Sequence, residues 1–77
     1  MNKEKAAKEA LRLYDAFHHT PEGKKAWAIA GDMDDHPDTA TDVVTDALED
    51  LYQKNYSEAD WDLIHEQLYE MVFAGIT

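Results

Sequence analysis

The sequence predicts an all-α fold, a small compact bundle of about four short helices. Apolar residues recur at three- and four-residue spacing in four separate stretches, and no stretch alternates apolar and polar residues as a strand would. Residues that favour helix ends separate these stretches. The chain has 77 residues, and two independent cores would need roughly twice that length. We therefore expect one acidic helical domain over residues 1–77.

The first helix is predicted to run from about Lys3 to Phe17. It ends there because Pro21 disfavours helical geometry at Thr20. Its apolar stripe consists of Ala6, Ala10, Leu13, Tyr14 and Phe17.

The second helix is short and has clear end signals. Thr20 is a good N-cap, and Pro21 fits the first helical position. Gly31 is expected just beyond the helix, in the left-handed conformation that glycine adopts easily. The apolar body consists of Ala26, Trp27, Ile29 and Ala30.

The third helix is predicted to begin near Pro37 or Asp38 and to run to about Lys54. Asn55 is expected to end it in the left-handed conformation. Its inner face reads Ala40, Val44, Ala47, Leu48 and Leu51.

The fourth helix has the clearest start. Ser57 is predicted as its N-cap, and Asp60 follows three residues later, close to the pattern of a capping box. One face then carries Trp61, Ile64, Leu68, Met71, Val72 and Gly75. Across the whole chain, the predicted core is Leu11, Tyr14, Phe17, Trp27, Ile29, Val44, Leu48, Leu51, Trp61, Ile64 and Leu68.

Negative charge dominates the chain and excludes several partner classes. Seven basic residues stand against 17 acidic ones, a formal net charge of −10. Residues 1–19 carry a net charge of +1, with four basic residues and three acids, whereas residues 20–77 carry −11, with three lysines and 14 acids. This balance argues against direct nucleic-acid binding and against an anionic membrane surface. Because there is no cysteine and no apolar run long enough for a membrane span, we expect a cytoplasmic protein.

The third helix carries a regular row of carboxylates. Asp38, Asp42, Asp46 and Asp50 follow at four-residue spacing and form what we call the acid ridge, with Glu49 beside it. Each like-charged pair at this spacing costs about 0.2–0.5 kcal/mol, so helix stability alone does not favour the row. Two interpretations remain: a solvated face that keeps the protein soluble, or a docking surface for a strongly basic partner.

The fourth helix carries a second candidate surface. Tyr69 and Phe73 fall outside its apolar stripe and lie among Asp62, Glu66 and Glu70. Either this helix is central and packed on two sides, or the rings form an exposed aromatic patch rimmed by acids. Such a patch would serve self-association into a homo-oligomer, or a partner.

Motifs for catalysis and metal binding are incomplete. The segment Asp32–Asp38 is rich in acids, but no register of it supplies both the glycine and the distal glutamate of an EF-hand loop. We interpret it as a connection whose aspartates cap the next helix, with weak divalent-cation response as an alternative. His65 and Glu66 begin a zinc-protease-like string that has Tyr69 where the second histidine is required. We expect no enzyme activity, no cofactor and no metal.

A short, acidic, cysteine-free chain without a catalytic motif resembles small phage-encoded inhibitor proteins, among them anti-CRISPR and anti-restriction proteins. The resemblance lies in size and charge, and it implies occupation of a nucleic-acid site on a target protein. Three hypotheses follow: an acidic inhibitor or adaptor that docks on a basic, nucleic-acid-binding protein; a helical domain that self-associates through the fourth helix; and a cation-responsive module.

Overall fold

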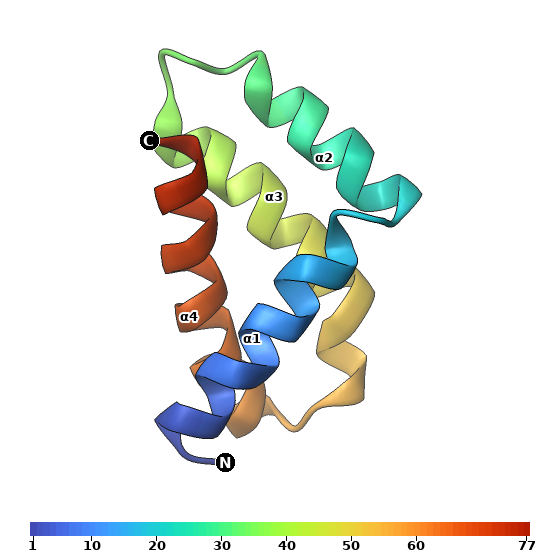
Figure 1. Ribbon diagram of the computed structural model, residues 1–77, viewed down its shortest axis with the longest axis vertical. Coiled ribbons are helices and arrows are strands. Elements are labelled where there is room, and N and C mark those ends of the chain that lie inside the picture. The colour runs from blue at the N-terminus through green and yellow to red at the C-terminus, as the bar shows by residue number, and fades with distance from the viewer.

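A computed structural model describes all 77 residues and confirms the all-α bundle. The elements are α1 (Lys3–Phe17), α2 (Pro21–Gly31), α3 (Pro37–Tyr52), the short 3₁₀ helix η1 (Gln53–Asn55) and α4 (Glu58–Ile76), and there is no strand (Figure 1). None of these helices combines the length and the apolarity needed to cross a lipid bilayer.

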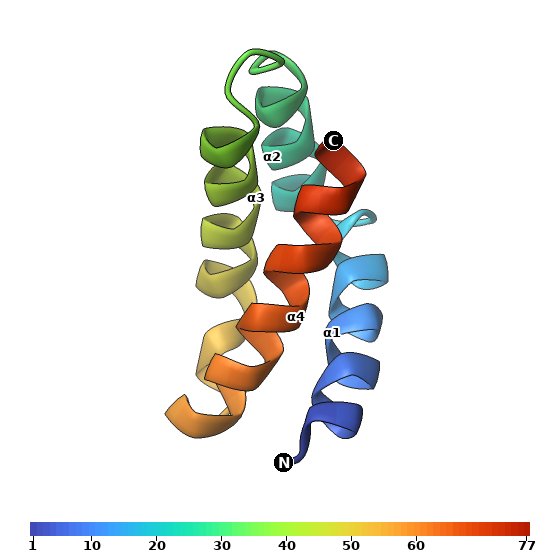
Figure 2. The same ribbon diagram turned by 90° about the vertical axis from the view of Figure 1, so that its left-hand side faces the viewer.

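Three helix pairs make most of the contacts: α2 with α3, α1 with α4, and α3 with α4. In Figure 2, α4 lies between α1 and α3, and α3 runs in the opposite direction to α2 and α4. The first residues of α1 and of α4 lie at the same end of the molecule. There the amino group of Met1 donates a hydrogen bond to Asp60 Oδ1 at 3.1 Å.

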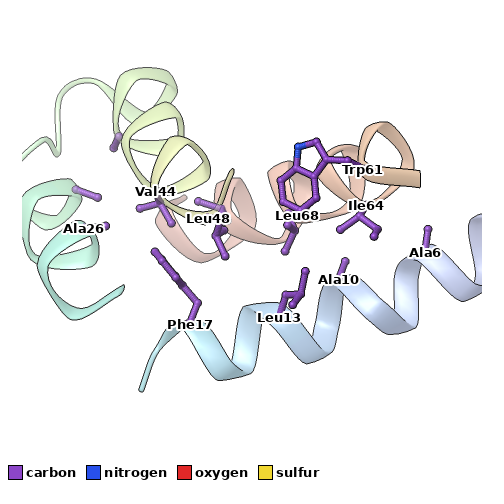
Figure 3. Close-up of a cluster of buried hydrophobic side chains, with 13 residues drawn as sticks. Ala6, Ala10, Leu13, Phe17, Ala26, Val44, Leu48, Trp61, Ile64 and Leu68 are labelled. Carbon is purple, nitrogen blue, oxygen red and sulfur yellow. The ribbon is translucent and has the colours of Figure 1, made fainter. Parts of the chain in front are cut away.

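Thirteen buried apolar residues form one core cluster among the four helices. Figure 3 shows Phe17 of α1 pointing towards Val44 and Leu48 of α3, while Leu13 faces Leu68 of α4. Tyr14, Trp27 and Leu51 are half-buried and pack against this cluster rather than inside it. Six residues of the predicted core are fully confirmed as buried: Phe17, Val44, Leu48, Trp61, Ile64 and Leu68.

Two residues of the predicted core are in fact exposed. Leu11 is 53% exposed, because it follows the buried Ala10 and its side chain points about 100° away from the α1 stripe. Ile29 is 44% exposed. The buried residues of α2 are the small ones, Gly23, Ala26 and Ala30, so the helix packs closely along that line and leaves Ile29 at its flank.

The predicted N-caps are confirmed at α2 and α4. The Thr20 hydroxyl accepts a hydrogen bond from the Gly23 N–H at 2.9 Å, and Ser57 Oγ accepts one from the Asp60 N–H at 3.2 Å. Both predicted left-handed endings are wrong, since no residue has a positive φ. Gly31 is the last residue of α2. The third helix was expected to run to about Lys54, but α3 ends at Tyr52. The tighter 3₁₀ helix η1 follows it and covers Gln53–Asn55.

Two threonines of α3 are buried although they are polar. Thr41 and Thr45 are 0% and 2% exposed. Their hydroxyls donate to the carbonyls of Pro37 and Thr41, at 2.8 and 3.0 Å, so neither group is left without a partner. The inner face of α3 is therefore wider than its apolar pattern indicates, and the aspartates are confined to the outer face.

Candidate functional site

The acid ridge lies on the solvent side of α3. All four of its aspartates are exposed, whereas Glu49 is half-buried. The buried face of the same helix carries Ala40, Thr41, Val44, Thr45 and Leu48, which packs against the neighbouring helices. Because every fourth residue is offset by about 40° around a helix, the ridge winds gradually over the outer surface of α3.

The ridge carboxylates have no partner within the molecule. The three ion pairs of the structure join Met1 to Asp60, Lys8 to Glu4 and Arg12 to Glu9, and none of them involves α3. No side-chain hydrogen bond reaches a ridge carboxylate either; the one bond to Asp42 is accepted by its backbone carbonyl. Unpaired carboxylates on a rigid helix leave their full negative field available to a partner.

A shallow groove with an apolar floor lies beside the ridge, between α2 and α3. Its volume is about 220 Å³. We call it the α2–α3 groove; it is lined by Ala26 and Ile29 of α2, by Val43 and Ala47 of α3, and by Glu22 and Lys25 at the rim. Sequence reasoning missed it, because Ile29 was assigned to the core. The small residues Gly23, Ala26 and Ala30 on one face of α2 could have indicated the groove. A helix that packs through small residues leaves its larger side chains, such as Ile29, at the flank of the contact.

The predicted surface on α4 is present in part. Asp62, Glu66 and Glu70 are exposed, as an acidic rim requires. Tyr69 and Phe73 are half-buried and stack on one another, with ring centroids 6.5 Å apart and planes 8° from parallel. Neither ring belongs to the apolar residues that pack against the core cluster. The two rings thus form a pair of their own on α4.

A polar network connects α1 to the segment before α4. Arg12 Nε donates to Glu9 Oε1 at 2.8 Å, and the Tyr56 hydroxyl donates to the same oxygen at 2.8 Å. The hydrogen bonds from Arg12 and then Tyr56 hold the pKa of the Glu9 carboxyl below its usual value. Burial and the hydrogen bond to Glu9 raise the pKa of Tyr56. This network links α1 to the segment before α4 and involves none of the ridge aspartates.

The acidic connection before α3 does not cap that helix as predicted. His36, not an aspartate, occupies the N-cap of α3, and its side chain makes no capping hydrogen bond. The aspartates of this connection do not come together: no three histidine, aspartate or glutamate side chains in the structure are placed to hold a metal ion.

A cavity of about 480 Å³ lies next to this connection, between the C-terminal ends of α2 and α4. Trp27 and Ile76 contribute to its wall, and Asp34 is the one acidic side chain that lines it. The indole N–H of Trp27 is buried without a hydrogen-bond partner. That N–H is covered by protein atoms and does not reach the open space of the cavity, so it offers no donor to a ligand there.

No protein-family model matches this chain, and no match was found among curated proteins or solved structures.

Proposed function

We propose that this protein is a non-enzymatic acidic binding protein that docks through the acid ridge on a basic surface of a nucleic-acid-binding partner. The single observation that carries the proposal is the row of four exposed, unpaired aspartates along one rigid helix. In this role the carboxylates stand where phosphates of a nucleic acid would otherwise bind, and the protein acts as an inhibitor or nucleic-acid mimic.

Consecutive ridge aspartates lie one helical turn apart, roughly 6 Å along the axis, so each pair repels. The positive end of the helix dipole compensates Asp38 in the first turn, but Asp46 and Asp50 lie too far along α3 to gain from it. A surface that costs stability and has no internal partner gains its favourable interactions from lysines and arginines of another molecule, and its field accelerates their encounter.

The proposal is tested with a charge-removal variant and a matched control. The ridge variant carries Asp42→Asn, Asp46→Asn and Asp50→Asn. The control carries Glu4→Gln, Asp15→Asn and Glu58→Gln, three exposed acids outside α3, and it loses the same charge. A partner captured from cells at low salt on the immobilised wild-type chain is purified, and its binding to all three proteins is measured over a range of salt.

We expect the ridge variant to bind the purified partner roughly tenfold more weakly, mainly through slower association, and with a weaker dependence on salt. The control should stay close to the wild type. The wild-type chain should also displace nucleic acid from the partner. Equal binding of the ridge variant and the wild type at low salt would show that the ridge is only a solvated face.

A second candidate function is self-association through α4. The observation that favours it is the Tyr69–Phe73 stack, which does not pack against the core and is flanked by exposed acids. Aromatic side chains surrounded by a charged rim are typical of protein interfaces. In this alternative the ridge serves solubility alone, and the partner is a second copy of the chain.

A further inference from the structure

The α2–α3 groove and the acid ridge share the same stretch of α3. The groove floor contains Val43 and Ala47. Residues three apart are neighbours on a helix surface, with Cβ atoms roughly 5–6 Å apart. Asp46 is therefore the neighbour of Val43, and Asp50 is the neighbour of Ala47. An apolar depression and a line of free carboxylates run side by side along about one and a half helical turns.

The opposite wall of the groove adds an apolar side chain that the fold leaves in solvent. Ile29 is one of three large hydrophobic residues exposed in the molecule, together with Met1 and Leu11. The rim residues Glu22 and Lys25 cancel one another in charge. The local field is therefore set by the ridge, and a segment that enters the groove meets apolar atoms below and carboxylates along one side.

We propose that the α2–α3 groove and the acid ridge together bind a basic amphipathic helix of a partner protein. One aliphatic side chain of that helix inserts beside Ile29, and its lysines or arginines pair with Asp46 and Asp50. This is helix-in-groove recognition, in which an apolar anchor is set by spacing and the flanking charges give orientation. The inference rests on the proposed function, because it identifies the kind of basic surface that the ridge recognises.

Volume and charge favour this occupant over others. A groove of about 220 Å³ falls below the roughly 300–1,000 Å³ of small-molecule pockets but accommodates a single large side chain. Nucleic acid would be repelled by the ridge. A second copy of this chain also carries a net charge of −10, so the two molecules repel at long range.

The test uses two labelled helical peptides of about 14 residues with equal positive charge. In the first, leucines at i, i+3, i+4 and i+7 form an apolar face among lysines; in the second, alanine replaces every leucine, which preserves the helix propensity. Fluorescence anisotropy measures the binding of both peptides to the intact chain. We expect the leucine peptide to bind roughly tenfold more tightly, because its anchor buries apolar area in the groove.

Matched variants locate the anchor. Ile29→Asn should remove most of the advantage of the leucine peptide, whereas Leu11→Asn changes a similarly exposed aliphatic residue on α1 and should leave binding unchanged. Methyl NMR spectra of the wild-type chain give a second readout that does not depend on a variant. The methyl signals of Ile29 and Val43 should shift with the leucine peptide, and those of Leu11 should not.

The outcomes separate the two proposals. If both peptides bind equally, and Ile29→Asn has no effect while the ridge variant weakens both, the ridge function stands and the groove inference is wrong. If neither peptide binds in a salt-dependent manner, the proposed function itself fails. Dimers in sedimentation that are lost with Ile29→Asn would identify a second copy as the occupant and overturn the basic-helix inference.

Discussion

Tyr56 donates a hydrogen bond to Glu9 across 47 positions of sequence, and this 2.8 Å contact ties the start of the α4 segment to the middle of α1. Arg12 donates to the same carboxylate oxygen from within α1. Glu9 is thus shared between a local and a long-range partner, and its ionised form is the one that both donors favour.

This relationship predicts an acid-sensitive contribution to stability. Because the folded-state pKa of Glu9 is lowered, the carboxylate stabilises the fold above its unfolded pKa, and that contribution is lost as the pH falls through the folded-state pKa. Tyr56→Phe should cost about 0.5–1.5 kcal/mol at neutral pH, and the pKa of Glu9 should rise. Urea unfolding between neutral and acidic pH, with Glu70→Gln as an exposed control, measures both effects. An unchanged pH profile in Tyr56→Phe would argue against the network.

Leu48 should be one of the most sensitive positions of the core. Its side chain is 0% exposed and faces the region that Phe17 enters (Figure 3). Leu48→Ala should lower the free energy of unfolding by about 2–5 kcal/mol, through lost burial and a residual cavity. Leu11→Ala removes the same atoms from an exposed position and should change it by less than about 0.5 kcal/mol. Circular dichroism during denaturant unfolding measures both free energies of unfolding. An equal decrease in the two variants would contradict the placement of these leucines.

Two glycines of α2 should respond in opposite ways to alanine. A Cβ on Gly23 would collide with the carbonyl oxygen of Phe17 and lie 2.6 Å from its carbonyl carbon, so the backbone between α1 and α2 would have to move. A Cβ on Gly31 meets nothing within 4 Å. We expect Gly23→Ala to lower the melting temperature clearly, and Gly31→Ala to leave it unchanged or raise it slightly through better helix propensity. A Gly23→Ala protein as stable as the wild type would show that the α1–α2 turn adapts freely.

The ridge variant should be more stable than the wild type even though it binds more weakly. Changing Asp42, Asp46 and Asp50 to Asn preserves side-chain size and relieves repulsion between consecutive turns, worth a few tenths of a kcal/mol for each pair. The gain should shrink at high salt, because screening already weakens the repulsion. Thermal unfolding at low and high ionic strength measures it. A loss of stability at low salt would show that the aspartates have favourable interactions within the fold.

The aromatic pair on α4 should control any self-association. Tyr69→Lys with Phe73→Glu removes both rings from a helix whose buried face is carried by Trp61, Ile64 and Leu68. If α4 is an interface, sedimentation should show a smaller species for this double variant while its helicity stays the same. A wild-type chain that sediments as a monomer at high concentration would exclude self-association, and the rings would then serve another contact.

Helix positions followed from local signals, because Thr20, Ser57 and Pro37 act on their own neighbouring backbone. Burial of the large residues on each stripe was predictable from the helical periodicity of the apolar residues, because the apolar face of each helix packs against the core. The error at Leu11 was local, because this residue lies off the apolar stripe of its own helix. The error at Ile29 arose because burial there depends on how closely two helices approach. Ile29 lies outside the core because Gly23, Ala26 and Ala30 bring α2 close to its neighbours, and no local pattern states that distance.

One part of the candidate site, the acid ridge, was predictable from the sequence, and the other part, the α2–α3 groove, was not. The exposure of the acid ridge follows from its position opposite Val44 and Leu48 on one helix. The α2–α3 groove required knowing that Val43 of one helix and Ile29 of another line the same depression, which is a property of the pairing between helices. The burial of Thr45 was missed because a polar side chain is expected to be exposed. Here the hydroxyl is hydrogen-bonded within α3 itself, so the side chain can be buried without losing its partner.

The uneven distribution of charge along the chain has a practical consequence for handling the molecule. On a cationic resin or sensor surface, the protein should adsorb through α3 and present α1, which lies on the other side of α4 in Figure 2, to the solution. Such an orientation would hide the ridge from any analyte. Since the chain contains no cysteine, a single Lys3→Cys substitution would provide a unique thiol anchor on α1, and a chip prepared through that thiol would leave the ridge facing outward.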